Sequence, residues 1–247
     1  MDRLDNLSYG TLFEQTLDIY LPENKDFDTM LYFHGGGLES GDKSDAQTFA
    51  EYLCENGIAT VSANYRMYPN AVFPDFIQDA ADAALWTYQN IRSYGGSGKF
   101  YIGGSSAGAY LSMMLCFHKE FLYARKIPME AVMGYIHDAG QPTCHYRVLA
   151  ERGLDPRRII VDESAPLFHM KPDADYPPML FVVSDDDIPN RYEQTMLAIS
   201  TLKCMGYGED RIKLRVIHGA HCQYVRAMDE DGKSTLGKII SEFIDML

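Results

Sequence analysis

Three segments of the chain carry side chains that could together perform nucleophilic catalysis: a serine in Gly104–Gly108, an aspartate in Ser184–Asp187 and a histidine in His218–His221. A serine needs a neighbouring base to lose its proton at neutral pH, and the base needs a carboxylate that fixes its tautomer and stabilises the imidazolium. Each segment directly follows a short apolar run typical of a buried strand. The pattern therefore predicts a Ser–His–Asp triad at the ends of three strands.

The serine segment has the form G-x-S-x-G, with Ser106 at its centre. It lies between a strand-like run, Lys99–Gly103, and an apolar helix-like run, Ala109–Leu115. Glycines let the chain turn sharply at such a junction and hold the central serine in a strained conformation with its hydroxyl exposed. This spacing predicts that Ser106, and not its neighbour Ser105, is the nucleophile.

A glycine-rich segment, His34–Gly37, follows another strand-like run, Thr29–Phe33. Consecutive glycines allow backbone N–H groups to point at a ligand without interference from side chains. Acyl transfer needs such donors, because the tetrahedral intermediate places negative charge on the former carbonyl oxygen. A flexible connection is the other interpretation, but the order of the segments along the chain favours an oxyanion hole.

These segments resemble those of the α/β-hydrolases, in particular the carboxylesterase and hormone-sensitive-lipase-like group with its HGGG and GxSxG motifs. The resemblance implies that Ser106 is the nucleophile, His221 the base and Asp187 the orienting acid. It also implies an oxyanion hole formed by the N–H groups of Gly36, Gly37 and Ala107. Three aspartates follow the strand-like run, so Asp185 remains the alternative acid, two positions earlier.

The chain departs from the stricter lipase-like members of that group. Ser105 stands where they have an aspartate, and Leu38 stands where an aromatic residue is usual. The residues before Tyr9 leave no room for their N-terminal cap, so we expect short acyl groups rather than long-chain esters. The residues expected to contact substrate are His34, Gly35, Leu38, Ser105, Tyr146 and Phe168.

Strand-like and helix-like runs alternate along the chain, which indicates a mostly parallel sheet with helices on both faces. The fold class expected is therefore α/β, with an α/β-hydrolase fold in a single domain over residues 1–247. The pattern lapses over residues 138–177, which we expect to form a small cap-like insertion over the site. Its candidate lining residues also include His137, Gln141 and His169. The other expected strands are 13–21, 58–63 and 131–136, and the other expected helices are 45–56, 76–94, 146–152, 192–205 and 236–246.

Composition restricts the partners and the compartment. The 247 residues carry a formal net charge of −13, which argues against nucleic acid because phosphates would be repelled. No run reaches the length of a membrane-spanning helix, and the first residues lack the pattern of a secretory signal. The five cysteines have no C-x-x-C spacing, which favours reduced thiols in a cytoplasmic protein.

The function expected from these features is a serine hydrolase that cleaves small carboxylic esters without a metal or an organic cofactor. A peptidase or amidase with the same triad is the first alternative. A non-catalytic ligand-binding protein on a hydrolase scaffold is the second, although such proteins commonly lose the histidine that this chain keeps. The alcohol portion of the substrate and the oligomeric state remain open.

Overall fold

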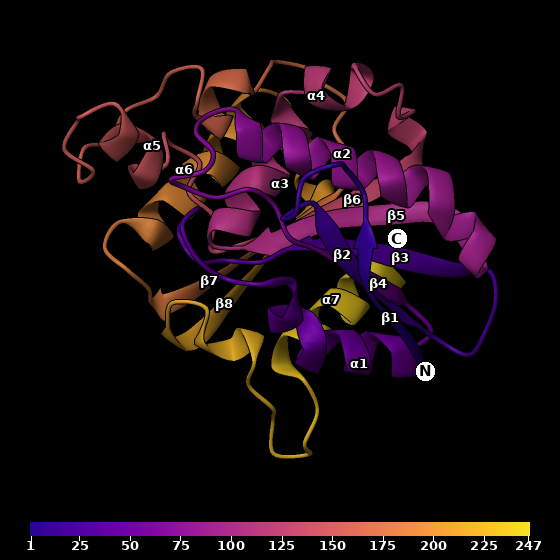
Figure 1. Ribbon diagram of the computed structural model, residues 1–247. Coiled ribbons are helices and arrows are strands. Elements are labelled where there is room, and N and C mark those ends of the chain that lie inside the picture. Colours follow the sequence, from indigo (N-terminus) through magenta and orange to yellow (C-terminus); the bar gives the residue numbers. More distant parts are fainter.

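The computed structural model describes the whole chain, residues 1–247, and contains one eight-stranded sheet (Figure 1). The strand order is β1-β2-β4-β3-β5-β6-β7-β8. β2 runs antiparallel to both of its neighbours, and every pair from β4 to β8 is parallel. The strands are β1 Asp2–Ser8, β2 Thr16–Leu21, β3 Phe27–Phe33, β4 Ala59–Ala63, β5 Gly96–Ser105, β6 Val132–Asp138, β7 Met179–Asp186 and β8 Ile212–Ala220. The predicted mostly parallel sheet is confirmed.

Helices cover both faces of the sheet, as Figure 1 shows. They are α1 Gln47–Glu55, α2 Asp75–Asn90, α3 Ala107–Phe117, α4 Glu120–Tyr123, α5 Tyr146–Glu151, α6 Arg191–Cys204 and α7 Thr235–Asp245. α1 and α7 pack together on one face, and α2 and α3 pack together on the other. A parallel sheet needs this double cover because its strands are apolar on both sides.

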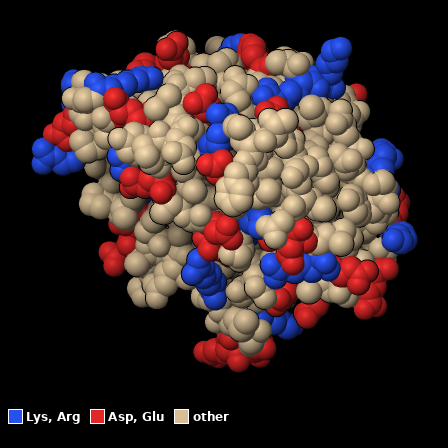
Figure 2. Space-filling view, viewed as in Figure 1, with Lys and Arg blue, Asp and Glu red and all other residues tan.

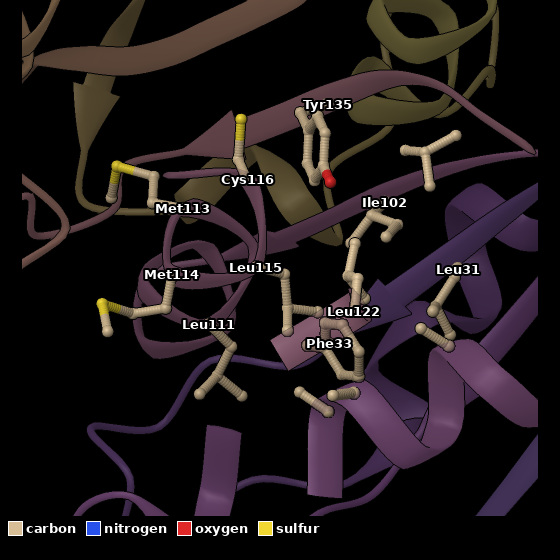
Figure 3. Close-up of a cluster of buried hydrophobic side chains, with 14 of the residues drawn as sticks. Leu31, Phe33, Ile102, Leu111, Met113, Met114, Leu115, Cys116, Leu122 and Tyr135 are labelled. Carbon is tan, nitrogen blue, oxygen red and sulfur yellow. The ribbon is translucent and has the colours of Figure 1, made fainter. Parts of the chain in front are cut away.

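The helix that follows the elbow, α3, is the most deeply placed of these. All eleven of its residues are buried, since it lies between the sheet and the helices outside it. Figure 3 shows its Leu111 and Leu115 beside Phe33 of β3 and Ile102 of β5, within one large apolar cluster. This packing makes the start of α3 a rigid support for the residues of the elbow.

The N-terminal strand β1 was not expected from the sequence. Its residues are almost all exposed, so they show no alternation of apolar and polar side chains. The alternating run 13–21 is typical of an edge strand or a hairpin strand, and β2 is the second of these, because β1 pairs antiparallel with it on its outer side. β2 is accordingly buried on both faces.

The segment between β6 and β7 contains α5, a short 3₁₀ turn at Pro166–His169 and no strand. Cys144, Leu149 and Ala165 form a small apolar cluster of their own there, apart from the main core. Asp138 is the last residue of β6, so the sheet extends one residue into the range expected for the insertion.

No helix is both long and apolar enough to cross a membrane. Figure 2 shows Lys and Arg interspersed with Asp and Glu over the face it displays, and no basic stripe crosses that face.

Candidate active site

The backbone at Ser106 has the strained geometry that the G-x-S-x-G pattern predicts. Ser106 has φ of 54° and ψ of −111° and stands between the end of β5 and the start of α3. A Cβ at Gly108 would collide with the carbonyl of Phe33, and one at Gly104 would collide with the backbone of Gly108. The turn is anchored by the Ser106 N–H, which donates to the carbonyl of Asp138 at 2.7 Å. The two glycines are therefore needed for the close approach of β3, β5 and α3.

Ser106, His221 and Asp187 form a continuous chain of hydrogen bonds. Ser106 Oγ donates to His221 Nε2 at 2.8 Å, and His221 Nδ1 donates to Asp187 Oδ1 at 2.5 Å. The Asp187 side chain is 1% exposed. Burial opposes its ionisation, but the hydrogen bond and charge of His221 and the N–H groups of Ile188 and Ser184 outweigh burial and lower the pKa of Asp187. The carboxylate is thus kept ionised beside the imidazole.

The three consecutive aspartates have distinct environments. Asp185 accepts a hydrogen bond from Nδ1 of His218 at 2.9 Å and another from the N–H of Gly219. Both Asp185 and Asp186 are exposed at the surface. Only Asp187 turns inward and reaches His221, as the turn register suggested, so Asp185 does not lie in the position of the acid.

Free backbone donors lie beside the serine. Gly36 and Gly37 have φ of 108° and 69°, and neither N–H donates to an acceptor within the protein. A Cβ at Gly36 would collide with Ser40, and one at Gly37 would collide with Oη of Tyr146. Ala107 is the first residue of α3, and an N–H at that position has no acceptor within the helix. These three groups can therefore donate to a negatively charged oxygen near Ser106.

A cavity of about 750 Å³, here called the catalytic pocket, opens in front of the serine. Ser106, His221, Gly36 and Gly37 line it, together with Tyr146 from α5. Five of its 17 lining residues are hydrophobic and four are glycines. The arrangement can hold a carbonyl compound between a nucleophile and a set of N–H donors.

Family and sequence comparisons agree with this geometry over the first half of the chain. The BD-FAE family model matches residues 17–136, which include the glycine loop and the elbow. An AB hydrolase superfamily protein of Schizosaccharomyces pombe is 37% identical over 87 residues, 34% of this chain and 26% of that protein. An isoprenylcysteine alpha-carbonyl methylesterase of Arabidopsis thaliana is 29% identical over 110 residues, 43% of this chain and 26% of that protein. The chain thus matches about a quarter of the length of these relatives.

Solved structures match over the whole chain. Esterase B from Lactobacillus rhamnosis has a TM-score of 0.76 and 16% identity, and the match covers 99% of this chain and 87% of that one. Esterase Est2 from Thermogutta terrifontis has a TM-score of 0.76 and 20% identity, with 98% and 93% covered. The chain has the α/β-hydrolase fold. This confirms the fold expected from the motifs, whereas the narrower lipase-like grouping stays a prediction.

Three of the residues expected to contact substrate do line the catalytic pocket: Gly35, Ser105 and Tyr146. Gly35 packs directly against Ser106, because a Cβ there would lie 3.3 Å from the serine Cβ. Tyr146 reaches the glycine loop from α5, as the collision at Gly37 shows.

The other three do not reach the pocket, which corrects the sequence-based expectation. His34 is fully buried, with its ring stacked on Tyr65 and its Nδ1 donating to the carbonyl of Gly35 at 2.7 Å. Burial lowers the pKa of His34, which favours a neutral structural role. Leu38 has φ of 65° and is fully buried within the apolar core. Phe168 is 58% exposed, in the 3₁₀ turn, and is not among the residues that line the pocket.

The remaining candidates from the expected insertion have different positions. His137 is buried in β6 and bonds to Ser112 Oγ at 2.8 Å, while His169 stacks on His118. Neither contributes to the catalytic pocket. Gln141 lines a separate cavity that adjoins it.

A buried polar network behind Ser106 was not expected from the sequence. Tyr32 Oη donates to Ser105 Oγ at 2.9 Å, and Ser105 Oγ donates to the carboxylate of Asp138. Tyr224 Oη donates to the other oxygen of that carboxylate. Burial raises the pKa of Asp138 to about 6, although both hydrogen bonds oppose the shift. Asp138 thus holds Ser105 by its side chain and Ser106 by its carbonyl. Its only sequence signal is an acidic residue at the end of an apolar strand.

Proposed function

We propose that this α/β-hydrolase is a serine carboxylesterase that cleaves short-acyl esters. The observation that carries the proposal is the hydrogen-bonded chain from Ser106 through His221 to Asp187, which ends at a pocket lined by the free N–H groups of Gly36 and Gly37. A nucleophile, an oriented base and oxyanion donors are the three parts that acyl transfer requires.

The proposed reaction has two stages. Ser106 Oγ attacks the ester carbonyl while His221 Nε2 takes its proton, and Asp187 stabilises the imidazolium. The N–H groups of Gly36, Gly37 and Ala107 receive the oxyanion of the tetrahedral intermediate. His221 then protonates the leaving alcohol, and a water deprotonated by the same histidine hydrolyses the acyl-enzyme.

The narrowing of the catalytic pocket by Tyr146 supports a short acyl group. The Thermogutta esterase, a structural relative, is described with propionate bound and with butyrate bound. Tyr146 narrows the pocket beside Gly37, so the segment from β6 to residue 177 is proposed as a small cap over the substrate. A cytoplasmic location is proposed because all five cysteines are free thiols.

An activity panel tests this proposal. We expect kcat/KM on p-nitrophenyl esters to peak between acetyl and butyryl and to fall by octanoyl, and aminoacyl anilides to be cleaved poorly. A fluorophosphonate should label Ser106 and not Ser105, because Ser105 is 3% exposed and its hydroxyl is already hydrogen-bonded. A maximum at decanoyl would favour a lipase, preference for the anilide would favour a peptidase, and no labelling would favour a ligand-binding protein.

A further inference from the structure

A second cavity, of about 440 Å³, adjoins the catalytic pocket. The two cavities share Tyr146 and Ile188 in their walls, so they are direct neighbours. We call this second cavity the arginine pocket, because Arg157, Arg158 and Arg191 contribute to its lining. The reaction proposed above assigns no role to it.

Arg191 is the unusual residue of the arginine pocket. It is the first residue of α6 and is 4% exposed, yet its side chain makes neither a hydrogen bond nor an ion pair with any other residue. Its Nη1 is fully buried without an acceptor. A guanidinium stays protonated inside a protein and carries five N–H donors, so burying it without a partner is costly. Such a group is expected to have a partner that the polypeptide itself does not supply.

The carboxylate that acts most strongly on Arg191 already has other partners. Burial lowers the pKa of the Arg191 guanidinium, and the carboxylate of Asp187 gives the largest opposing effect. Asp187, however, accepts hydrogen bonds from His221, Ile188 and Ser184, and it forms no ion pair with Arg191. Asp187 therefore cannot satisfy the donors of the guanidinium.

The rest of the arginine pocket carries one more unpaired positive charge. Arg158 is exposed and has no side-chain partner, while Arg157 pairs with Asp155 outside the lining. No Asp or Glu lines the pocket, although the chain has 35 acidic residues against 22 basic ones. In Figure 2, blue side chains protrude at the left edge, where Figure 1 places the segment after α5. The N-terminal end of α6 opens onto the same space without a side-chain cap, which adds positive potential.

We propose that the arginine pocket binds a carboxylate carried by the non-reacting part of the ester substrate, with Arg191 as its main donor. A planar guanidinium matches a carboxylate with two parallel hydrogen bonds, and a partly dehydrated site strengthens them. The proposal rests on the proposed esterase function and narrows it: the preferred substrates are acidic esters. The carboxylate can belong to the acyl group or to the alcohol, and the two sources require separate substrates.

The test compares acidic esters with neutral partners of matched size. For the acyl side, the 4-nitrophenyl monoester of glutaric acid is compared with 4-nitrophenyl pentanoate, after subtraction of spontaneous hydrolysis. For the alcohol side, 4-acetoxybenzoate is compared with 4-acetoxybenzamide. We expect kcat/KM of the wild type to favour the acidic member of one pair by about ten- to a hundredfold, the range of a charged hydrogen bond. Arg191→Met should abolish this preference and Arg158→Met should reduce it a few-fold.

The matched control is Arg92→Met, which removes the same charge from an exposed arginine without side-chain partners, at the amino end of β5. It should leave the acidic-to-neutral ratio unchanged. A change at Arg191 that alters the triad through Asp187 would affect the acidic and the neutral ester alike. The ratio of their kcat/KM values is therefore insensitive to it. If Arg191→Met does not fold, Arg191→Lys keeps the charge but loses the planar fork, and the ratio should still fall. A wild type that prefers both neutral esters would overturn the proposal, as would a ratio that Arg191 variants leave intact.

A binding measurement separates this proposal from the esterase function. Calorimetric titration of Ser106→Ala with glutarate and with 4-hydroxybenzoate needs no turnover. If Ser106→Ala binds either compound and the double variant Ser106→Ala/Arg191→Met does not, the result supports the arginine pocket. This holds even if no ester is hydrolysed. Absence of binding to both, in a wild type that hydrolyses neutral esters, refutes the pocket and leaves the esterase function standing.

Discussion

Replacing Asp187 by asparagine separates the proposed catalytic carboxylate from its two neighbours in the sequence. Asp187 Oδ1 accepts from His221 Nδ1 at 2.5 Å and from the N–H of Ile188 at 2.8 Å, and Oδ2 accepts from the N–H of Ser184 at 3.3 Å. An asparagine amide has one acceptor oxygen in place of two, so it cannot serve all three donors.

The amide can take two orientations. With its oxygen toward His221 and Ile188, it keeps the two shorter hydrogen bonds, and its NH₂ faces the more distant N–H of Ser184. The histidine tautomer then survives, but the negative charge that stabilises the imidazolium is lost. An adjacent carboxylate favours the charged form of a base by about ten- to a thousandfold. The reverse orientation places NH₂ against Ile188 and forces the wrong tautomer, which costs about 10⁴-fold in kcat.

In the first orientation the amide NH₂ opposes only the more distant N–H of Ser184, so this orientation is the more favourable one. We therefore expect Asp187→Asn to lose about 10²- to 10³-fold in kcat on p-nitrophenyl acetate. Asp185→Asn is the matched control, because Asp185 is exposed and paired with His218. It should stay within a few-fold of the wild type. Circular dichroism and thermal unfolding establish that both variants are folded. Near-normal kcat in Asp187→Asn together with collapse of Asp185→Asn would refute the assignment of the acid.

Three further perturbations test other parts of the site. Gly37→Ala places a methyl group against Tyr146 at a positive φ. This should displace the N–H of residue 37 from the oxyanion and lower kcat by about 10²-fold or more. The control is Gly153→Ala, which has a similar φ in open space and should leave kcat unchanged. Leu38→Ala should cost about 2–5 kcal/mol in the free energy of unfolding, measured by urea denaturation, without changing the acyl-length profile. Burial raises the pKa of Asp138 from 3.8 to about 6, so its contribution to stability is present below pH 4 and is lost as the pH rises through 6. The free energy of unfolding of the wild type should therefore fall, relative to Asp138→Asn, by about 3 kcal/mol across that range, and parallel pH curves would contradict this.

Much of the site could be predicted because its parts are local patterns at the ends of parallel strands. The carboxyl ends of β3, β5, β7 and β8 meet at one edge, so segments far apart in the sequence converge once the strands are recognised. The turn register at Ser184–Asp187 also identified which of three aspartates faces His221. In each case the backbone conformation, such as the positive φ of Ser106, restricts the residue types that can stand next to it, and the sequence shows that restriction.

The direction in which each side chain points could not be predicted from such restrictions. Leu38 belongs to the glycine-rich loop by sequence, but its φ of 65° turns its side chain into the core instead of the pocket. His34 begins the same loop, and stacking on Tyr65 holds its ring beneath the loop. Phe168 is apolar within the expected cap, yet the 3₁₀ turn exposes it to solvent. A motif thus predicts the path of the backbone better than the contacts of each residue within it.

Two groups extend the site beyond its motifs: Asp138, whose side-chain partners are distant in sequence, and Arg191, whose side chain has no partner within the chain. Asp138 meets Ser105 across 33 positions and Tyr224 across 86, separations that no local periodicity encodes. Both nevertheless occupy predictable places: Asp138 ends β6, and Arg191 begins the helix after β7. In a sheet whose carboxyl ends converge, a charged residue that directly ends a buried strand or opens the next helix points to the same edge as the triad. Position relative to the strand, rather than similarity to a motif, is therefore the feature that would have selected these two residues from the sequence.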